Sequence, residues 1–348
     1  MKTEEKKEKP FRGNIYVIRN EQIISEGQSF RDGRVLLQKT SGFADWANRI
    51  PNTLDTRFGS ASAGKVFVAV GILQLIEQGK LRWEDTLGEL VDREWNLIDR
   101  DVTVRQLLTH TSGVPDYFDE STMEEYEELW VDFPNYRIRH NSDLLPLFIE
   151  KPMMYPKGEK FQYNNSGYVL LALILETITG QEFDRYLQEN VFDRCHMHST
   201  GYYELDRLPE KCANHYIFCP DTGDFRTHIF TVDAKGTGAG GAYTTVKDIV
   251  RFWENLLNGS LLSKEMVAAM LQKQAGDGEE AYGYGVWIWE NPEGENCPYF
   301  QGCDPGVSFL SEYHPQSGTI SVLMSNYGDD VWEEMRRLRP LLYGDRQG

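Results

Sequence analysis

Segments typical of strands lie towards both ends of this 348-residue chain, whereas segments typical of helices occupy its middle. Runs rich in β-branched and apolar residues predict strands at 14–19, 33–38, 282–290, 298–313 and 318–326. Apolar runs predict helices at 63–79, 103–108, 166–179, 182–190, 245–257, 263–272 and 330–343. Three of these helices begin at a residue that can cap them: Thr103, Thr245 and Ser263. This order predicts one sheet assembled from both ends of the chain, with a helical region inserted between its two parts.

The extent of the insertion follows from this order. We expect an α/β (α+β) fold, in which an antiparallel sheet flanked by helices is built from residues 12–74 and 236–348. A mostly helical domain is expected to span residues 75–235. Residues 1–11 begin with a run rich in lysine and glutamate and are expected to be disordered. A cleft between a sheet and a helical insert is a common place for a functional site.

The predicted helix at 63–79 is apolar on nearly every side, which indicates a buried helix. Ser62 stands where a loop enters this helix, and Lys65 follows three residues later. Residues with this spacing share one helical face, so the Lys65 amine can reach the Ser62 hydroxyl. The positive helix N-terminus favours an alkoxide there, and a desolvated lysine can lose its proton and act as a base. The alternative is that Ser62 only caps the helix and that Lys65 is exposed.

A second group of polar residues, 163–166, directly precedes the helix predicted at 166–179. A lysine nearby can lower the pKa of a tyrosine, so Tyr163 is a candidate for proton transfer. Asn165 can form hydrogen bonds with a substrate carbonyl and with Lys65. The alternative is that Tyr163 packs in the core while Asn165 or its neighbour caps the helix.

A third candidate lies on the strand predicted at 298–313. Gly302 would permit close backbone approach by a ligand, and the N–H of Cys303 could then form an oxyanion hole with the N–H of Ser62. The alternative for Gly302 is a bulge or a turn, and Pro305-Gly306 is typical of a turn. A nucleophilic Cys303 thiol is disfavoured because no histidine lies close to it in the sequence.

In this order the three motifs resemble those of the serine β-lactamase and penicillin-binding-protein-like family, nearest to its class C, DD-peptidase and family VIII esterase branch. The resemblance covers roughly residues 12–340. Further segments that carry it are residues 42–45, 50–58, 72–81, 107–113, 156–168 and 239–245. The resemblance implies a β-lactamase/transpeptidase-like fold.

Roles for individual residues come with this resemblance. It implies that Ser62 is the acylated nucleophile, that Lys65 is its base, and that Tyr163 is the partner of Lys65 in proton transfer. Asn165 would orient the substrate, and the N–H groups of Ser62 and Cys303 would form the oxyanion hole. A covalent acyl-enzyme would then be hydrolysed or aminolysed. No metal or organic cofactor is implied.

The chain departs from the family at the third motif, which usually reads Lys or His, any residue, then Gly. Here Phe300 stands in the position of the cation, two residues before Gly302. Losing a charge-assisted contact to a substrate carboxylate costs about 1.5–3 kcal/mol. We therefore expect weak or absent β-lactamase activity, and expect Phe300 to contact a neutral ester or amide. An arginine elsewhere replacing the missing charge is the alternative.

The net charge and the composition limit the classes of molecule that this chain is expected to bind. The formal net charge of −18 disfavours nucleic acid and anionic membranes, which leaves a small-molecule or peptide substrate. The five cysteines argue against a disulfide framework, and a metal site at 195–198 is disfavoured because no second ligand pair lies nearby. No apolar run is long enough for a membrane span, and no signal-like segment is present. The chain as given is expected to be cytoplasmic, with export and oligomeric state left open.

Two functions are consistent with these features. The first is a serine hydrolase that forms an acyl-enzyme on Ser62 and acts on an ester, amide or β-lactam carbonyl, with carboxylesterase or D-peptidase activity plausible. The second is a catalytically weak binding protein for peptidoglycan-like peptides or for a protein partner. The presence of Ser62, Lys65 and Tyr163 favours the first function. The altered third motif favours the second.

Overall fold

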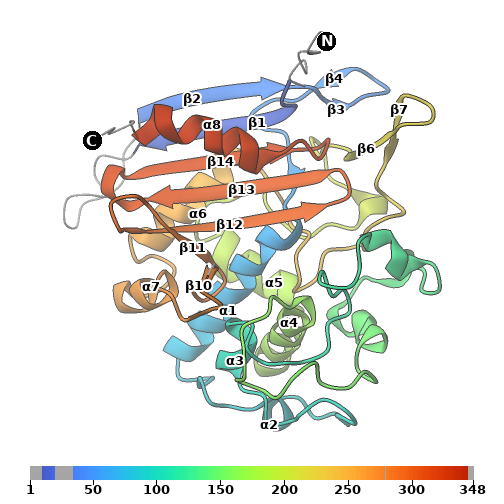
Figure 1. Cartoon of the computed structure of the whole chain (residues 1–348), viewed down its shortest axis with the longest axis vertical. Coiled ribbons are helices and arrows are strands. Elements are labelled where there is room, and N and C mark those ends of the chain that lie inside the picture. The colour runs from blue at the N-terminus through green and yellow to red at the C-terminus, as the bar shows by residue number, and fades with distance from the viewer. Residues whose placement is uncertain (1–9, 20–33, 279, 344–348) are drawn as a thin grey trace, which may run out of the picture.

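The computed structural model describes residues 10–19, 34–278 and 280–343, and its largest element is an eight-stranded sheet (Figure 1). The strand order is β2-β1-β14-β13-β12-β11-β10-β9, and every neighbouring pair is antiparallel. The N-terminal strands are β1 (Gly13–Arg19) and β2 (Arg34–Ser41). The C-terminal strands are β9 (Ala275–Gly276), β10 (Ala281–Tyr282), β11 (Trp287–Glu290), β12 (Asn296–Asp304), β13 (Val307–His314) and β14 (Thr319–Ser325). The predicted α+β fold, with a sheet built from both ends of the chain, is confirmed.

Helices cover both faces of this sheet. Helix α8 (Val331–Tyr343) lies over one face, and α6 (Val246–Leu257) packs behind the other (Figure 1). Side chains alternate between the two layers, because successive residues of a strand point to opposite faces. Leu323 of β14 packs in the cluster under α8, whereas Val322 and Met324 belong to the main core with α6. Every residue of β14 is consequently buried.

The helical insert packs around one central buried helix. Helix α1 (Lys65–Glu77) contacts α4 (Asn165–Thr179) and α5 (Phe183–Leu187), and its residues 65–75 are all buried, as its apolar sequence predicts. Gly71 permits this packing, since a Cβ there would lie 2.8 Å from Leu175 Cδ1. The remaining helices are α2 (Leu87–Leu90), α3 (Val104–Leu108) and α7 (Lys264–Met270). The short 3-10 helices are η1 (Ala61–Gly64), η2 (Tyr126–Trp130), η3 (Asn135–Arg137), η4 (Asn141–Leu147), η6 (Leu205–Arg207) and η7 (Pro315–Ser317), and η5 (Gln188–Phe192) is a short π-helix.

Side chains cap the helices largely where the sequence predicts. Thr103, Thr245 and Ser263 each accept a backbone hydrogen bond at the start of α3, α6 and α7. The cap of α4 is different: Asn164 Oδ1 accepts the Gly167 N–H at 2.7 Å. Asn165 is therefore the first helical residue, and its side chain is free for other contacts.

Two predicted strands are each divided in the structure. The segment 282–290 forms β10 and β11 on either side of a turn, because Gly285 adopts a φ of 82°. The segment 298–313 forms β12 and β13, joined by the turn at Pro305-Gly306. The helix predicted at 182–190 is α5, which continues into η5.

The predicted domain limits differ from the elements in three respects. The limit between 74 and 75 falls inside α1, so this helix joins the sheet region to the insert. The insert also contains a hairpin of β6 (Tyr216–Cys219) and β7 (Asp224–Thr227). Of the segment predicted to be disordered, 1–11, Phe11 is buried under α8 because its ring is apolar, and residues 1–9 lie outside the described residues. The other short pairs are β3 (Phe43–Asp45) with β4 (Ile50–Pro51), and β5 (Phe58–Gly59) with β8 (Tyr243–Thr244).

The sequence analysis finds no apolar run long enough to span a membrane, and the helices of the structure can be compared with this expectation. Among the residues that the structure describes, none of the helices combines the length and the apolar character needed to cross a bilayer.

Candidate active site

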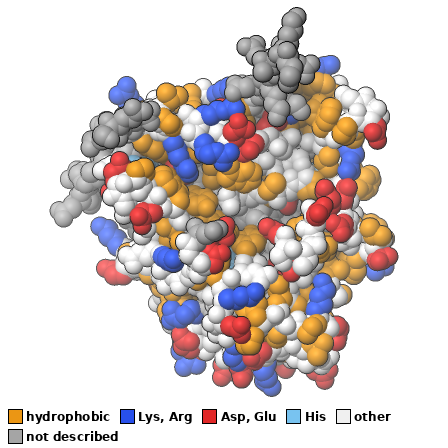
Figure 2. All heavy atoms as spheres, in the orientation of Figure 1, with side chains coloured by type: hydrophobic (Ala, Val, Ile, Leu, Met, Phe, Trp, Pro, Cys, Tyr) orange, Lys and Arg blue, Asp and Glu red, His pale blue; other side chains and the backbone are white. Residues whose placement is uncertain are grey.

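A cavity of about 860 Å³ opens where the end of β12 meets η1 and the loops of the insert. Five of the seven residues predicted for the site line it: Ser62, Tyr163, Asn165, Gly302 and Cys303. Figure 2 shows this face hollowed below the sheet, with acidic and hydrophobic side chains around the hollow. The structure thus brings together residues from three distant parts of the chain.

Ser62 lies in η1, immediately before α1. The preceding residue, Ala61, has a φ of 45°, which is uncommon for a residue with a side chain. The loop after residue 235 packs against this turn, where Gly241 N donates to Ala61 O at 2.9 Å. A Cβ on Gly240 would lie 2.2 Å from the same oxygen, so only glycine allows the approach. The contacts of Gly240 and Gly241 thus hold the strained turn in place, and the turn presents Ser62 to the cavity.

Lys65 is almost completely buried beside Ser62, with 2% of its surface exposed. Its Nζ donates to Ser62 Oγ at 3.0 Å, to Asn165 Oδ1 at 2.8 Å and to Ala239 O at 2.5 Å. Burial lowers the pKa of Lys65 to about 8, although nearby carboxylates act in the opposite direction. The amine therefore loses its proton close to neutral pH, which suits a general base.

Tyr163 stands next to this pair. Its ring centre is 4.9 Å from Lys65 Nζ, and its two ring neighbours are His110 at 4.6 Å and Trp287 at 5.6 Å. Burial raises the pKa of Tyr163 well above its ordinary value, with a smaller increase from the carboxylate of Glu120. The expected lowering by Lys65 is therefore wrong, because desolvation of the phenolate outweighs the nearby amine. Tyr163 is a neutral phenol that can pass on a proton.

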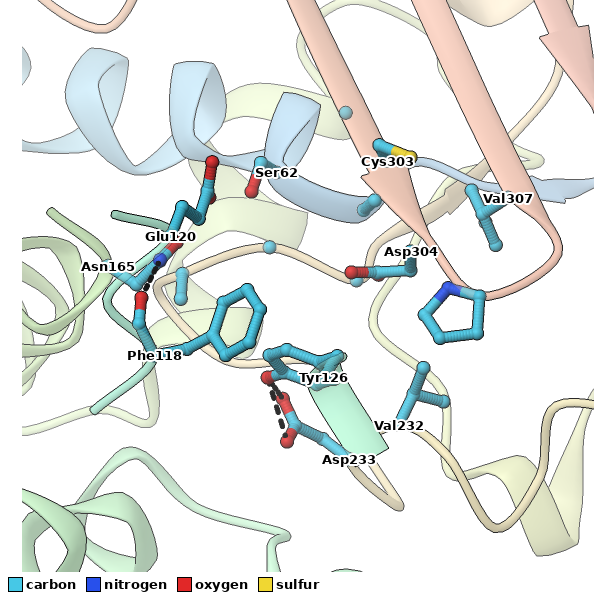
Figure 3. Close-up of a pocket in the computed structure, with 18 of the residues that line it drawn as sticks. Ser62, Phe118, Glu120, Tyr126, Asn165, Val232, Asp233, Cys303, Asp304 and Val307 are labelled. Atoms are coloured by element: carbon cyan, nitrogen blue, oxygen red, sulfur yellow. Dashed lines mark hydrogen bonds between the residues drawn. The ribbon is translucent and has the colours of Figure 1, made fainter. Parts of the chain in front are cut away.

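Asn165 is positioned by a carboxylate that the sequence did not reveal. Asn165 Nδ2 donates to Phe118 O at 3.1 Å and to Asp116 Oδ2 at 3.3 Å (Figure 3 labels Asn165 and Phe118). Asp116 also accepts from the backbone N–H of Asn165 at 2.8 Å and of Ser166 at 3.1 Å. Burial raises the pKa of Asp116 to about 6. Both acceptors of the Asn165 Nδ2 group are therefore fixed, so the amide cannot turn over. Its Oδ1 stays directed at Lys65 Nζ.

Gly302 allows β12 to lie directly on the turn that carries Ser62. A Cβ at Gly302 would lie 2.2 Å from Ser60 O and 2.8 Å from Ser62 N. The next residue, Cys303, opens on to the same cavity. Desolvation and the neighbouring Asp304 carboxylate raise the pKa of the Cys303 thiol to about 11. The thiol is thus protonated at neutral pH, which disfavours it as a nucleophile.

Phe300 lies outside the cavity, contrary to the expectation that it contacts substrate. It is 2% exposed and stacks on Trp253 of α6 at 5.2 Å and on Phe309 of β13 at 5.8 Å. An aromatic ring on this face of β12 gains free energy by entering the core between the sheet and α6. The residue of this motif that faces the cavity is Gln301, whose Oε1 accepts from Trp332 Nε1 of α8.

Three acidic residues from distant parts of the chain also face the cavity: Glu120 and Asp233 from loops, and Asp304 from the end of β12 (Figure 3). Burial raises the pKa of Asp233 to about 8 and that of Asp304 to about 7, and the charge of Asp304 adds to the effect on Asp233. Asp233 accepts from the Tyr126 hydroxyl at 3.3 Å. No spacing in the sequence relates positions 120, 233 and 304, so sequence reasoning missed this group.

The possible metal ligands at 195–198 lie elsewhere. Cys195 is buried, and burial raises the pKa of its thiol to about 12. Within the described part of the chain, no three His, Cys, Asp or Glu side chains are grouped so that they could hold a metal ion.

The fold defines a class of protein together with one feature of the site, a buried lysine that is hydrogen-bonded to a serine at the start of a helix. This class is the serine hydrolases of the penicillin-binding type. The profile of the β-lactamase family matches residues 29–341. The chain therefore belongs to the β-lactamase family.

Three similar proteins illustrate this membership. A penicillin-binding protein structure from Bacillus halodurans is 37% identical, covers 95% of this chain and 97% of its own, and superimposes with a TM-score of 0.87. A penicillin-binding protein of Bacillus subtilis (strain 168) is 27% identical over 88% of this chain and 69% of its own length. A D-amino acid amidase structure from Ochrobactrum anthropi SV3, complexed with D-phenylalanine, is 22% identical, covers 91% of this chain and 87% of its own, and has a TM-score of 0.72. The predicted family, fold and enzyme class, a serine hydrolase acting on an ester, amide or β-lactam carbonyl, are confirmed.

Proposed function

We propose that this serine hydrolase works through an acyl-enzyme on Ser62, with Lys65 as the base. The observation that carries the proposal is the contact of 3.0 Å between Lys65 Nζ and Ser62 Oγ at a lysine that is 2% exposed. Neutral Lys65 accepts the hydroxyl proton while Ser62 Oγ forms a bond to the substrate carbonyl carbon. The carbonyl π electrons move to oxygen, where the N–H groups of Ser62 and Cys303 stabilise the negative charge.

Tyr163 then delivers the proton that the leaving group needs. When the tetrahedral intermediate collapses, the bond from carbon to the leaving oxygen or nitrogen breaks, and the phenol donates its proton there. The Lys65 ammonium returns a proton to Tyr163, so both groups regain their starting states. The high pKa of Tyr163 supports this role as a neutral relay rather than a standing base.

Hydrolysis of the acyl-enzyme repeats these steps with water. A water molecule gives a proton to Lys65 and bonds to the acyl carbon. The bond to Ser62 Oγ then breaks, and the serine oxygen takes a proton from the same lysine and tyrosine pair. Asn165, fixed by Asp116, keeps Lys65 aligned in both half-reactions.

The substrates that fit this site are amides and esters rather than carboxylate-bearing β-lactams. The apolar Phe300 occupies the motif position of the family cation and is buried in the core, so it offers a substrate carboxylate no charge. A D-amino acid amidase among the structures of this fold supports a small amide as the substrate class. β-Lactam turnover is accordingly expected to be weak.

Mass spectrometry of the intact protein tests the proposal. The wild type is treated with a fluorescent penicillin and with a p-nitrophenyl ester in parallel, and Ser62→Ala is treated in the same way. We expect an adduct on the wild type, formed faster with the ester, and none on the variant. The matched control is Ser60→Ala, since Ser60 is buried two residues away and its hydroxyl has no partner among the described residues.

The binding-protein alternative predicts a different result. A folded wild type that binds ligand but acquires no adduct from either reagent would contradict the proposed mechanism. An adduct that persists in Ser62→Ala would assign the nucleophile to another residue.

A further inference from the structure

Two buried histidines lie at the base of the hairpin of β6 and β7. His215 immediately precedes β6, and His228 immediately follows β7. The backbone N–H of His228 donates to His215 O at 3.1 Å, so the pair continues the ladder of the hairpin. The two residues are 0% and 5% exposed, and their ring centres are 4.6 Å apart. The proposed acyl transfer uses neither of them.

His215 is joined to the strand that leads to Ser62. The backbone N–H of Gly59, the last residue of β5, donates to His215 Nε2 at 2.9 Å. The residue opposite Gly59 in β8, Tyr243, exchanges both of its backbone hydrogen bonds with Gly201. Because Gly59 is buried, its N–H needs an acceptor inside the protein, and His215 supplies it.

This hydrogen bond fixes the chemical form of the His215 ring. A backbone N–H can only donate, so Nε2 must hold a lone pair, and the proton of the neutral ring must lie on Nδ1. Burial lowers the pKa of His215 well below its ordinary value, and the adjacent His228 lowers it further. A charged ring would instead direct an N–H at the Gly59 N–H. The neutral form is therefore the one that holds β5.

Side chains do not hold the stretch between Gly59 and Ser62. The Ser60 hydroxyl has no partner among the described residues, and Ala61 carries only a methyl group. Backbone hydrogen bonds fix this stretch, among them that of Ser60 N to the carbonyl just before β8 at 2.8 Å and that of Gly59 N to His215. The position of the Ser62 N–H therefore depends in part on the hydrogen bond at Gly59.

The base of the same hairpin also contacts the turn between β12 and β13. A Cβ on Gly306 would lie 2.9 Å from the backbone N and O of Tyr216, so this turn packs on the first residue of β6. The Pro305 carbonyl accepts a hydrogen bond from the His228 ring. Cys303 lies just before this turn, near the end of β12. The hairpin base therefore contacts both chain segments that carry the proposed oxyanion donors.

We infer that His215 is a positioning residue for the proposed oxyanion hole: through Gly59 it holds the turn of Ser62 in register with the strand of Cys303. The inference rests on the proposed acyl-enzyme function and adds to it a residue that does not line the cavity. Without the acceptor on His215, β5 can shift and carry the Ser62 N–H with it. Hydrogen bonds weaken steeply as their angle worsens, so a small displacement of this donor lowers the rate.

Two substitutions at His215 separate the hydrogen bond from the space that the ring fills. His215→Leu removes the acceptor, whereas His215→Gln places an amide oxygen at the same number of bonds from Cα as Nε2. Each variant is assayed with p-nitrophenyl acetate and with its thiono analogue, in which sulfur replaces only the carbonyl oxygen. The N–H groups of an oxyanion hole bind oxygen better than sulfur, so the ratio of the two kcat/KM values reports on the hole.

The expected loss is specific to the oxygen ester. In His215→Leu we expect kcat/KM for p-nitrophenyl acetate to fall about 10- to 100-fold and the ratio of oxygen to thiono ester to fall about tenfold. His215→Gln should recover most of both. His198→Leu is the control, since His198 is exposed and does not line the cavity, and it should leave both values unchanged. Circular dichroism shows whether each variant is folded.

The outcomes separate this inference from the proposed function. The inference is overturned by a folded His215→Leu with an unchanged ratio, or by equal losses in His215→Leu and His215→Gln, while ester activity still depends on Ser62. Ester activity that survives in Ser62→Ala would count against the proposed function instead.

The form of the ring can also be measured in the wild type. Nuclear magnetic resonance of protein labelled with ¹⁵N-histidine distinguishes a ring nitrogen that carries a proton from one that holds a lone pair. The signals of His215 are assigned by their loss in His215→Gln. At pH 7.5 we expect a neutral ring with its proton on Nδ1. A proton on Nε2 would remove the acceptor and overturn the inference, even if His215→Leu does not fold.

Discussion

Lys65 and Tyr163 show how burial sets the chemistry of single residues in this protein. Lys65 is buried and Tyr163 borders the cavity beside it, and desolvation disfavours the charged form of each. For the lysine the neutral form is the base, so burial prepares it to accept a proton. For the tyrosine the neutral form is the acid, so burial prepares it to donate one. One environment thus suits both members of the proposed proton relay.

The pKa of Lys65 predicts the pH dependence of acylation. The amine that accepts the proton becomes populated as the pH rises through about 8. We therefore expect log(kcat/KM) for a neutral p-nitrophenyl ester to rise with pH below about 8 and to level off above it. Lys65→Ala should lower the rate by about 10²–10⁴-fold. Steady-state kinetics from pH 5.5 to 9.5 measure both effects.

A suitable comparison is Lys247→Ala, which removes an exposed lysine paired with Asp55 and should keep the wild-type profile. A wild-type profile that stays flat across pH 8 would contradict the role of Lys65.

The pKa of Asp233 predicts a change in stability with pH. Its folded-state pKa of about 8 lies above the ordinary value of 3.8, so the folded state binds more protons between these values. The contribution of the group is complete below pH 3.8 and is lost as the pH rises through about 8. Asp233→Asn, which cannot ionise, should raise the free energy of unfolding at pH 8.5 by about 1–3 kcal/mol more than it does at pH 5, because the loss accumulates between the two pKa values. Urea unfolding at the two values of pH measures the difference, and a loss of stability at pH 8.5 would refute the burial of this charge.

At the scale of elements, the site depends on how closely β12 approaches η1. The two elements touch through Gly302, whose missing side chain leaves room for the backbone of Ser60 and Ser62. Helix α4 arrives from the other side, with Asn164 as its cap and Asn165 directed at Lys65. Three elements from distant parts of the chain therefore meet at one serine.

Replacing Gly302 should separate β12 from η1. In Gly302→Ala the new Cβ meets backbone atoms at 2.2–2.8 Å, so the strand must move and the proposed oxyanion hole opens. We expect acylation of Ser62 to fall about 10²–10³-fold, the loss typical for an oxyanion-hole donor. Labelling kinetics and circular dichroism measure activity and folding separately. Gly223→Ala in the turn between β6 and β7 serves as the control: a Cβ there meets nothing within 4 Å, the φ of 67° strains only this turn, and the residue does not line the cavity, so the variant should label normally. Normal labelling of Gly302→Ala would show that the approach of β12 is not required.

At the scale of the whole molecule, the two ends of the chain are joined in one sheet. β1 pairs with β14 from Asn14 opposite Met324 to Arg19 opposite Thr319. Arg12 extends this junction: its guanidinium contacts Asp329 at 2.6 Å and lies over the ring of Tyr327 at 4.3 Å. The sheet that carries Gly302 and Cys303 therefore depends on contacts across more than 300 positions of sequence.

Removal of Asp329 tests this junction. The carboxylate is 15% exposed and accepts from both the backbone and the guanidinium of Arg12. We expect Asp329→Ala to lower the free energy of unfolding by about 1.5–3 kcal/mol, the range for hydrogen bonds to charged groups. Asp55→Ala, which removes an exposed pair with Lys247, should cost at most about 1 kcal/mol. Equal effects of the two substitutions in urea unfolding would argue against a structural role for the junction.

Features set by neighbours in sequence could be predicted from the chain. The contact between Ser62 and Lys65 follows from the spacing of three residues at the start of a helix, and Thr103, Thr245 and Ser263 were correctly predicted as caps. The sheet built from both ends followed from the order of strand and helix patterns. Hydrogen bonds within a turn and side-chain periodicity act over a few residues, so the sequence carries them directly.

Features that depend on burial could not be predicted from the sequence and became visible only in the folded structure. The approach of Asp116 to Asn165, the meeting of Glu120, Asp233 and Asp304 in one cavity, and the core position of Phe300 arise from segments far apart in sequence. The raised pKa of Tyr163 has the same origin. Desolvation depends on all the atoms packed around a group, and those atoms come from every part of the chain. The sequence therefore pointed to the proposed nucleophile and its proposed base, whereas the acidic lining of the cavity around them emerged from tertiary packing.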